Sequence, residues 1–317
     1  MSVIDSSILK ALGEIVVSPL LTDVTMADIS SWRVGGKARV LVQPSSLEEI
    51  IKLRQYMTKH QLPNLVIGNT TNLLFTDEAI DAVILKIGRE LAKVELNNHV
   101  IVAQAGVWMP KLARIALQAG LSGIEHTCGI PGTLGGLAVM NGGSQRKAIG
   151  DNILYVRTVD AKGVLKKYDN PECLFGYRRS IFQELDEIIV EVALQLKPTR
   201  NKLQMHKEIL SILRARSKKF PRKWPNCGSV FVSNPAMYEK YGPPGKIIEE
   251  CGLKGLKKGG AKISYNHANF IINNDGASAK DILYLIDLIR DRIYKSTGYL
   301  MKVEPKLVEP LGVINSI

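Results

Sequence analysis

The sequence predicts a globular protein of mixed helices and strands, arranged in two or three lobes. Its 317 residues exceed the size of one ordinary domain. Apolar residues make up 45% of the chain and charged residues 23%, a balance that is typical of a folded protein and argues against a disordered or fibrous one. Segments with the two-residue period of a strand alternate with segments of helical period, which indicates both kinds of element.

A strand–helix–strand pattern lies near the N-terminus. Residues 38–42 are predicted to form the first strand. Capping-box patterns that begin at Ser45 and at Ser46 both precede apolar residues at helical spacing, so either serine is a candidate helix start. Pro63 ends the predicted helix, and the apolar run 64–67 predicts the second strand.

Two segments are rich in groups that bind anions. Residues 68–72, Gly-Asn-Thr-Thr-Asn, follow the second strand and offer backbone N–H groups and hydroxyls. Residues 106–150 hold ten of the 27 glycines, with the run 129–136 as their core. Each glycine in regular structure costs about 0.5–1 kcal/mol of entropy, so such a concentration needs a reason. A series of turns is one interpretation, and we favour a loop pressed against a phosphate or a flat ring system.

We predict a domain boundary near residue 200. Before it, strict alternation over 188–196 predicts a strand with one fully apolar face, and 197–201 forms a linker. After it, one helix ends in a basic cluster, and the last helix begins near Ser278 with an apolar stripe that we expect in the core. The basic cluster consists of Arg214, Arg216, Lys218, Lys219, Arg222 and Lys223, and the stripe of Ile282, Leu285, Ile286, Ile289 and Ile293. Residues 1–28 are predicted to be a short amphipathic lead-in.

The net charge is 42 − 30 = +12, which is compatible with nucleic acid, a membrane surface or small polyanions as partners. No apolar run reaches the about 18 residues that span a bilayer. The N-terminal segment carries Asp5, Lys10 and Glu14, which the apolar core of a secretory signal would not. We therefore expect a cytoplasmic protein. Four cysteines without metal-ligand spacing predict neither a disulfide scaffold nor a metal site.

Common nucleotide-binding and catalytic motifs are absent from the sequence. It contains neither GxGxxG after a strand nor GxxxxGK[ST], and neither HExxH nor GxSxG. His126 and His267 stand in Gly- or Ala-rich contexts, and we interpret both as structural histidines with satisfied hydrogen bonds. The first half is rich in glycine and in groups that can bind phosphate, and the second half is basic. Together they fit a flavoprotein without the dinucleotide fingerprint.

Seven short segments, spread from about residue 30 to 312, share their order with those of a known family. The first is similar to F-R-I-G-G-x-A, the third to G-I-P-G-[ST]-V-G-G, the fourth to F-G-Y-R-x-S-x-F and the fifth to [AC]-G-S-[VF]-F. They are Trp32–Ala38, Gly68–Leu74, Gly123–Asn141, Phe175–Phe182, Cys227–Phe231, Gly259–Ala261 and His267–Phe270. In this order the chain resembles the UDP-N-acetylenolpyruvoylglucosamine reductases, the MurB family.

The resemblance implies an α+β fold with two domains. Residues 29–200 would form an FAD-binding domain of the vanillyl-alcohol-oxidase (PCMH) type in two α/β lobes, and 201–317 a C-terminal α+β substrate domain. It also implies noncovalent FAD, NADPH as co-substrate, a UDP-sugar substrate, no metal and a monomer. The implied cofactor-binding residues are Arg33, Gly68, Asn69, Thr70, Thr71, Asn72, Gly129, Ile130, Pro131, Gly132, Thr133, Gly135, Gly136 and Asn141, and the substrate-binding residues are Tyr177 and Asn269.

Three catalytic residues carry over from the resemblance. Arg178 would stabilise the charge that develops on the substrate carboxylate, because a guanidinium is always charged and can hold a carboxylate with two bonds. Ser229 would donate a proton. The family's catalytic Glu falls on Glu304 when its C-terminal motif is aligned without gaps from Gly298. Aligned instead from Gly312, the motif places Lys306 at the acid position.

The chain departs from the family pattern at several positions. Thr70 and Thr71 replace Gly and Ser, and the Cβ of Thr70 requires either a negative φ or strain. Gln145-Arg146-Lys147 stands where the family has Tyr-Gly-Gly, and Val232-Ser233 where it has Lys. A divergent relative acting on another sugar nucleotide is therefore one alternative. A non-enzymatic nucleic-acid binder is another, but only Phe220 and Trp224 interleave the basic residues.

Overall fold

The computed structural model describes residues 3–18 and 20–317, in two compact units. Unit 1 comprises the described parts of Met1–Leu21, Val40–Asn69 and Val83–Arg216. Unit 2 comprises Thr22–Arg39, Thr70–Ala82 and Ser217–Ile317. Neither unit is a continuous stretch of chain, because two short N-terminal segments join the C-terminal residues. The functional division at residue 200 stays a prediction.

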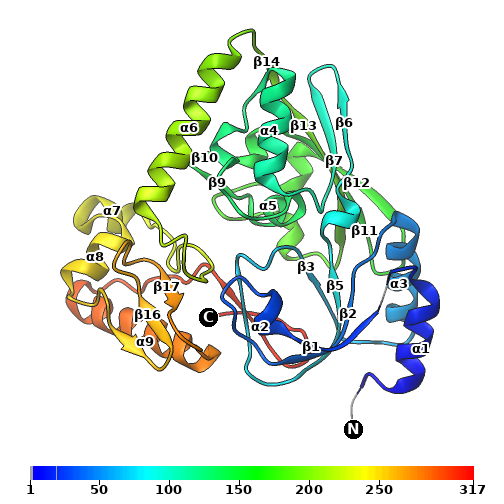
Figure 1. The fold of residues 1–317 in the computed structure, drawn as a ribbon, viewed down its shortest axis with the longest axis horizontal. Coiled ribbons are helices and arrows are strands. Elements are labelled where there is room, and N and C mark those ends of the chain that lie inside the picture. The colour runs from blue at the N-terminus through cyan, green and yellow to red at the C-terminus, as the bar shows by residue number, and fades with distance from the viewer. Residues whose placement is uncertain (1–2, 19) are drawn as a thin grey trace. The chain divides into compact units, whose positions relative to one another are not determined.

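Unit 1 contains most of the helices and strands (Figure 1). Its helices are α1 (Ser6–Ile15), α3 (Leu47–Lys59), α4 (Met109–Ala119), α5 (Leu134–Met140) and most of α6 (Lys202–Lys219). The short 3-10 helices are η1 (Arg89–Leu91), η2 (Glu125–Thr127), η3 (Ile149–Asp151), η4 (Asn170–Cys173) and η5 (Ile181–Gln183). The strands are β3 (Asn64–Ile67), β6 (Val94–Asn97), β7 (Val100–Gln104), β8 (Leu121–Ser122), β9 (Gly143–Ser144), β10 (Lys147–Ala148), β11 (Ile153–Val159), β12 (Leu165–Asp169), β13 (Ile188–Gln195) and β14 (Lys197–Pro198).

Two sheets form the framework of the chain's first part. One has the order β12-β11-β13-β7-β6, with antiparallel pairing throughout. The other has the order β1-β2-β5-β3, in which β3 and β5 pair in parallel. Strands β2 (Lys37–Val42) and β5 (Ile80–Lys86) each run from unit 2 into unit 1. The strands predicted at 38–42, 64–67 and 188–196 are confirmed within about one residue.

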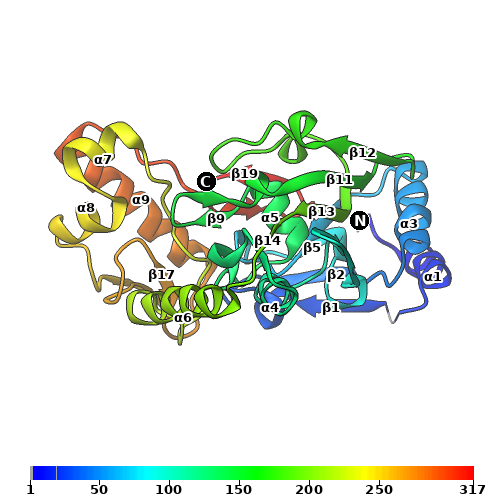
Figure 2. The same cartoon turned by 90° about the horizontal axis from the view of Figure 1, so that it is seen from above.

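The predicted helix after the first strand is α3, and its N-cap is Ser46. The Ser46 side chain accepts a hydrogen bond from the backbone of Glu49 at 3.2 Å. The Glu49 carboxylate in turn accepts from the Ser45 backbone at 2.7 Å, so the two candidate serines both take part in the helix start. The lead-in is also part of the fold. Leu12 of α1 is buried in the core of unit 1, and α1 lies beside α3 (Figure 2).

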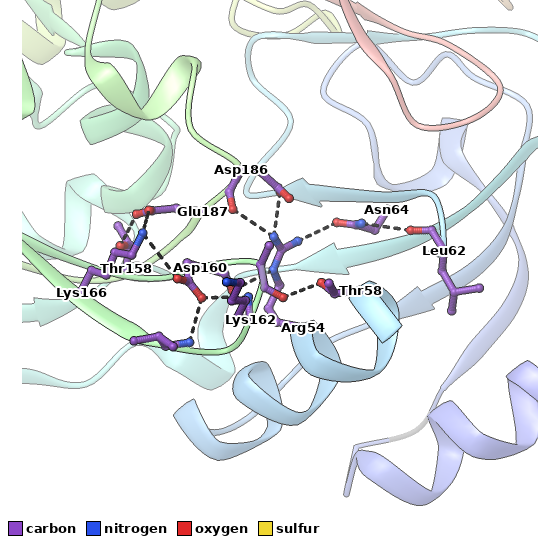
Figure 3. A network of polar contacts seen from close by, with 12 residues as sticks. Arg54, Thr58, Leu62, Asn64, Thr158, Asp160, Lys162, Lys166, Asp186 and Glu187 are labelled. Carbon is purple, nitrogen blue, oxygen red and sulfur yellow. Dashed lines mark hydrogen bonds and ion pairs between the residues drawn. The ribbon is translucent and has the colours of Figure 1, made fainter. Parts of the chain in front are cut away.

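A buried arginine connects α3 to the rest of unit 1 (Figure 3). Arg54 is 1% exposed. Its guanidinium donates to the carbonyls of Asp160 and Asp186 and to the side chain of Asn64, at 3.0–3.3 Å, and pairs with the Asp186 carboxylate at 2.8 Å. The charge is therefore compensated and hydrogen-bonded, as burial requires.

Unit 2 is built around its long helix α9 (Ala279–Thr297) and a small antiparallel sheet, β15-β16-β17. Its other elements are β1 (Leu21–Thr25), α2 (Met26–Ile29), β4 (Leu73–Phe75), α7 (Pro235–Tyr241), α8 (Pro244–Glu250), β15 (Lys257–Lys258), β16 (Ala261–Ile263), β17 (Ile271–Asn273), β18 (Lys306–Val308) and β19 (Ile314–Ser316). The prediction for the last helix is confirmed. Ser278 caps α9 in a capping box with Asp281, and all five residues of the stripe are buried.

Helix α6 differs from its prediction at its C-terminal end. It ends at Lys219, two residues before Pro221, so Arg222 and Lys223 lie beyond the helix rather than in it. Its buried Ile209 and Ile212 form a cluster with Ala113 of α4, so the helix up to Arg216 belongs to unit 1. Within residues 3–18 and 20–317, no helix combines the length and apolar character needed to cross a bilayer.

Candidate active site

The glycine-rich run 129–136 forms a close-packed loop in unit 1 that leads into α5. Gly68, at the end of β3, lies against it: a Cβ at Gly68 would be 2.4 Å from the Thr133 hydroxyl. The Asn69 side chain donates to the Pro131 carbonyl at 2.9 Å. Thr133 caps α5 and accepts from the Gly136 backbone at 3.3 Å. The structure therefore brings the predicted residues 68, 69 and 129–136 together, with space for a side chain excluded at Gly68.

Asn141 and Arg178 belong to the next part of unit 1. Asn141 ends α5 with a φ of 41°, and its side chain donates to the Gly176 carbonyl at 2.8 Å and accepts from the Gly150 backbone at 2.9 Å. Residues 176 and 179 exchange two backbone hydrogen bonds around a tight turn. Arg178 occupies this turn with a φ of 56°, a conformation that side chains rarely adopt.

Arg178 is fixed by its surroundings. Its Nη2 donates to the Gly143 carbonyl at 3.3 Å, and its own carbonyl accepts from the Gln183 side chain at 3.0 Å. Its guanidinium lies 5.2 Å from the ring centre of Tyr177, which is 64% exposed. A strained, well-held arginine is a candidate functional residue, because the fold alone gives no reason for the strain. Gln183 is a positioning residue that the sequence reasoning missed.

In unit 2, the backbone of Thr70 shows which of the two predicted possibilities holds, a negative φ or strain. Its φ is 55°, so the backbone keeps the left-handed conformation that suits glycine, and the threonine is strained. Thr70 is 4% exposed, and its hydroxyl accepts from the Ser31 backbone at 2.9 Å. Asn72 donates from its side chain to the Glu304 carbonyl at 3.3 Å. Arg33, also at positive φ (53°), has an exposed side chain, and its carbonyl accepts from Asn273 at 3.1 Å.

Ser229 and Glu304 lie on neighbouring extended segments of unit 2. The Glu304 backbone donates to the Val230 carbonyl at 2.8 Å, and Phe231 forms a β-bridge with Val303. In this register Glu304 lies opposite Val230, the residue that follows Ser229 in the chain. Ser229 is partly exposed, and no described residue hydrogen-bonds its hydroxyl.

Lys306, the alternative candidate for the acid position, belongs to a different sheet. It begins β18, which pairs in parallel with β4, and its backbone donates to the Asn72 carbonyl at 3.0 Å. Its ammonium donates to the Ser316 hydroxyl at 2.7 Å. Burial, together with nearby Lys302, lowers the Lys306 pKa, but its side chain is engaged with β19. Whether Glu304 or Lys306 occupies the acid position stays a prediction, in which we favour Glu304.

Two further side chains support the segment that carries Ser229. The Asn269 carboxamide accepts from the Phe231 backbone and donates to its carbonyl, both at 2.9 Å. The structure thus shows Asn269 holding the Ser229 segment, while direct substrate contact by Asn269 stays a prediction. The Cys227 thiol donates to the Leu73 carbonyl at 3.3 Å, and burial raises its pKa far above the ordinary range. Cys227 is therefore a neutral packing residue.

Glu125 and His126 of η2 immediately precede the glycine-rich loop and were not predicted as site residues. Both are buried, at 4% and 1% exposure. One Glu125 oxygen accepts from Gly123 at 2.9 Å, but the other has no partner among the described residues, and neither ring nitrogen of His126 has one. The interpretation of His126 as a satisfied structural histidine is therefore wrong by strict hydrogen-bond geometry, although the Gly123 backbone still interacts with the ring. Burial first, and nearby Lys147 second, lower its pKa, so the ring is neutral.

The glycines of unit 1 allow close packing around the run 129–136. A Cβ at Gly68 would lie 2.4 Å from the Thr133 hydroxyl, and one at Gly135 would lie 2.9 Å from the Ala105 Cβ. Beside it, three buried polar atoms of Glu125 and His126 lack partners in the described chain. Buried polar atoms ordinarily have partners, but these three have no solvent access in the described chain, so they do not mark a ligand contact. Within the described residues, no group of three or more His, Cys, Asp or Glu is placed to hold a metal ion.

Comparisons with known proteins agree with this geometry. Residues 38–169 match the model of an FAD binding domain, and residues 220–308 match that of the UDP-N-acetylenolpyruvoylglucosamine reductase C-terminal domain. The chain is 44% identical over 283 residues to UDP-N-acetylenolpyruvoylglucosamine reductase 1 of Corynebacterium glutamicum, covering 89% of this chain and 84% of that protein. It is 39% identical to the reductase of Carboxydothermus hydrogenoformans, covering 93% and 95%. The crystal structure of the Thermus caldophilus enzyme (MurB) superposes with a TM-score of 0.76 at 30% identity, covering 91% of this chain and 98% of that one.

The matched domain and the glycine-rich site define a flavin-dependent oxidoreductase that binds FAD. The α+β fold predicted from the sequence, with an FAD-binding domain and a C-terminal substrate domain, is confirmed. The chain belongs to the UDP-N-acetylenolpyruvoylglucosamine reductase family.

Proposed function

We propose that this chain reduces UDP-N-acetylglucosamine enolpyruvate to UDP-N-acetylmuramate in peptidoglycan synthesis, with NADPH as the reductant and noncovalent FAD. The family membership supports the reaction. The observation that supports the assignment to this chain's residues is the backbone hydrogen bond from Glu304 to Val230, which pairs the segment of Glu304 with that of Ser229. When bound, FAD supplies the relay of hydride from NADPH to C3 of the enolpyruvyl ether.

Arg178 holds the carboxylate of the enolpyruvyl group in this proposal. As C3 gains hydride, negative charge spreads onto C2 and the carboxylate, and a fixed guanidinium lowers the energy of that state. The hydrogen bonds of Arg178 with Gly143 and Gln183 hold it in place before the reaction. Less reorganisation is then needed in the transition state.

Ser229 donates the proton to C2 that completes the reduction. An ordinary hydroxyl is a weak acid, so the alkoxide left on Ser229 has to be stabilised or reprotonated with the help of a neighbour. Glu304 is the catalytic candidate on the segment paired with that of Ser229. In this proposal Glu304 orients the Ser229 hydroxyl while that hydroxyl gives up and regains its proton. We propose the fourteen cofactor residues named above as the FAD site, and Tyr177 and Asn269 as substrate contacts. A cytoplasmic monomer remains part of the proposal.

An anaerobic two-step experiment tests the function. The flavin is first reduced with NADPH, and UDP-N-acetylglucosamine enolpyruvate is then added while flavin absorbance is followed. Reoxidation with formation of UDP-N-acetylmuramate is expected. Reduction without reoxidation would contradict the proposed substrate and favour a relative that acts on another sugar nucleotide. Absence of bound flavin, combined with nucleic-acid binding at physiological salt, would contradict the whole assignment.

Variants assign the roles. Ser229→Ala and Glu304→Gln should leave the NADPH half-reaction within about twofold and slow reoxidation by a factor of about 100 or more. Arg178→Lys should also slow reoxidation, since lysine keeps the charge but loses the planar fork. Lys306→Met is the control that separates the two alignments. A larger defect in Lys306→Met than in Glu304→Gln would contradict the assignment of Glu304.

A further inference from the structure

A hairpin with an unusual turn lies next to Arg178. Strands β9 and β10 pair antiparallel, with Ser144 opposite Lys147, so Gln145 and Arg146 are the two central residues of the turn. Their φ angles are 55° and 62°. A two-residue hairpin turn with both φ positive favours Asn and Gly, because a Cβ is strained there. Gln and Arg are poor choices for this backbone, so the turn itself does not explain them.

The base of the hairpin is anchored to the candidate active-site residues of unit 1. The Gly143 carbonyl accepts from Arg178 Nη2 at 3.3 Å. The Ser144 hydroxyl donates to the His126 carbonyl at 2.6 Å. The Ala148 backbone donates to the Asp151 carboxylate at 3.0 Å. Strand β9 thus connects the proposed substrate arginine to η2, which precedes the glycine-rich loop.

The positive charges of the hairpin are weakly compensated. Arg146 is exposed and has no ion pair among the described residues. Lys147 pairs with Glu208 at 3.8 Å, with side chains 54% and 39% exposed, a long surface pair that contributes little. Asp151 accepts a hydrogen bond from the Ala148 backbone and forms no ion pair with Arg146 or Lys147. The tip of the hairpin therefore presents two cations to solvent.

We propose that Arg146 and Lys147 bind a phosphate group of a co-substrate and so determine specificity in the proposed reaction. An arginine can hold a phosphate with two parallel bonds, and a neighbouring lysine adds a point charge. Two phosphates have this chemistry: the 2′-phosphate of NADPH and the diphosphate of the UDP-sugar. The strain at Arg146 is then retained because its guanidinium serves binding. The proposal rests on the proposed function, since that reaction supplies both ligands.

The test removes the charges without disturbing the turn. The double variant Arg146→Asn/Lys147→Gln removes both positive charges from the hairpin. Folding should be preserved, because Asn tolerates the left-handed backbone at position 146. The matched control is Lys59→Gln/Arg89→Asn, which removes two exposed charges from α3 and η1. kcat/KM is measured for NADPH, for NADH and for the UDP-sugar, at about 50 and 200 mM salt.

We expect the double variant to lose at least about tenfold in kcat/KM for the phosphate-bearing ligand, with a weaker salt dependence. A loss with NADPH but not NADH identifies the 2′-phosphate. A loss with the UDP-sugar under either reductant identifies the diphosphate. Changes below about twofold in both, or an equal loss in the control, would overturn the proposal.

A binding measurement separates this inference from the proposed function. Calorimetry of the FAD-loaded protein with 2′,5′-ADP, AMP and UDP needs no turnover. Weaker binding of 2′,5′-ADP or UDP by the double variant, with AMP as the control ligand, supports the phosphate site even if the proposed substrate is not reduced. Unchanged affinities for both ligands overturn the site, even if the wild-type enzyme performs the reaction.

Discussion

Two buried polar side chains of unit 1, Arg54 and His126, differ in whether their polar atoms are hydrogen-bonded. The Arg54 guanidinium uses all three of its nitrogens, on Asp160, Asn64 and Asp186 (Figure 3). His126 is as deeply buried, yet neither ring nitrogen has a partner among the described residues. An unsatisfied buried polar group costs about 1–3 kcal/mol, whereas a satisfied one does not. The first region is therefore organised for stability, and the second keeps hydrogen-bonding capacity at a cost to the fold.

The position of each group agrees with this difference. Arg54 connects α3 to the turn between β11 and β12 and to the chain before β13. His126 precedes the glycine-rich loop and lies beside the hairpin that contacts Arg178. An unmet buried polar group needs its own explanation, such as an ordered water or a strained site. The comparison thus separates a satisfied buried group from an unsatisfied one without reference to the motifs.

Removing Arg54 should have the largest effect on stability. Arg54→Met keeps the aliphatic stem but leaves the Asp160 and Asp186 carbonyls without their donors. We expect a loss of about 2–4 kcal/mol in the free energy of unfolding. Urea denaturation measures it as a lower midpoint with unchanged slope. Asp186 is 76% exposed on its side chain, so its charge returns to water and does not add to this loss.

Arg89→Met is the matched control for Arg54. Arg89 is 92% exposed and pairs with Glu90 at 3.0 Å on the surface, so its loss should change stability by less than about 1 kcal/mol. Equal effects of the two variants would contradict the structural role of the buried network.

Removing the polar atoms of His126 should act in the opposite direction. His126→Leu fills similar space without polar atoms, so the flavin-free protein should gain about 1 kcal/mol. FAD affinity should stay nearly unchanged, because both ring nitrogens are closed off from solvent in the described chain. Titration of the flavin-free protein with FAD measures the affinity, and urea denaturation the stability. Lower stability, or a clear loss of FAD affinity, would contradict this interpretation of His126.

His267 in unit 2 is an intermediate case, and its pH dependence tests the principle. Its Nδ1 accepts from the Asn269 backbone at 3.3 Å. Burial first, then Lys219 and Lys254, lower its pKa from 6.5 to about 4, against the opposing effect of Glu249. Between pH 6.5 and about 4, His267 is therefore protonated in the unfolded chain but not in the folded chain.

The stabilising contribution of His267 should be complete above pH 6.5 and be lost progressively as the pH falls toward 4. Urea midpoints across this range should fall less steeply in His267→Phe than in wild type. Lys219→Met removes one of the cations that keep the ring neutral, so it should raise the His267 pKa in the folded chain. The pH range over which stability falls should then end at a higher pH. A slope in His267→Phe as steep as in wild type would assign the pH dependence to other groups.

The sequence predicted the elements whose signals are local. Ser46 and Ser278 begin helices because their capping side chains and apolar periods are adjacent in the chain. The network of Arg54 could not be predicted, since its partners Asp160 and Asp186 are 106 and 132 residues away. The state of His126 was also beyond reach, because burial and missing partners are tertiary properties. Its place just before the glycine-rich run was the one signal that could have marked it.

The site shows the same limit. The ordered motifs indicated Arg178, Ser229 and Glu304 as candidates, and two alignments for the acid remained open. The non-local pairing of Glu304 with Val230 is a tertiary property that the motifs could not show. Motifs also could not show that Arg178 has a positive φ, because that depends on the turn closed by residues 176 and 179.

Thr70 gives the smallest and most discriminating test, because its hydroxyl is satisfied while its backbone is strained. The strain of a side chain at a φ of 55° costs about 1–2 kcal/mol, and the hydrogen bond from Ser31 returns about 1 kcal/mol. Thr70→Ala loses the bond and keeps the strain, so it should lower the free energy of unfolding by about 1 kcal/mol. Thr70→Gly loses the bond and the strain together, offset by about 0.5–1 kcal/mol of chain entropy. The glycine variant should therefore be at least as stable as the alanine variant in urea denaturation. If alanine were the more stable, the backbone at Thr70 would not be strained, and the threonine would be an ordinary buried residue.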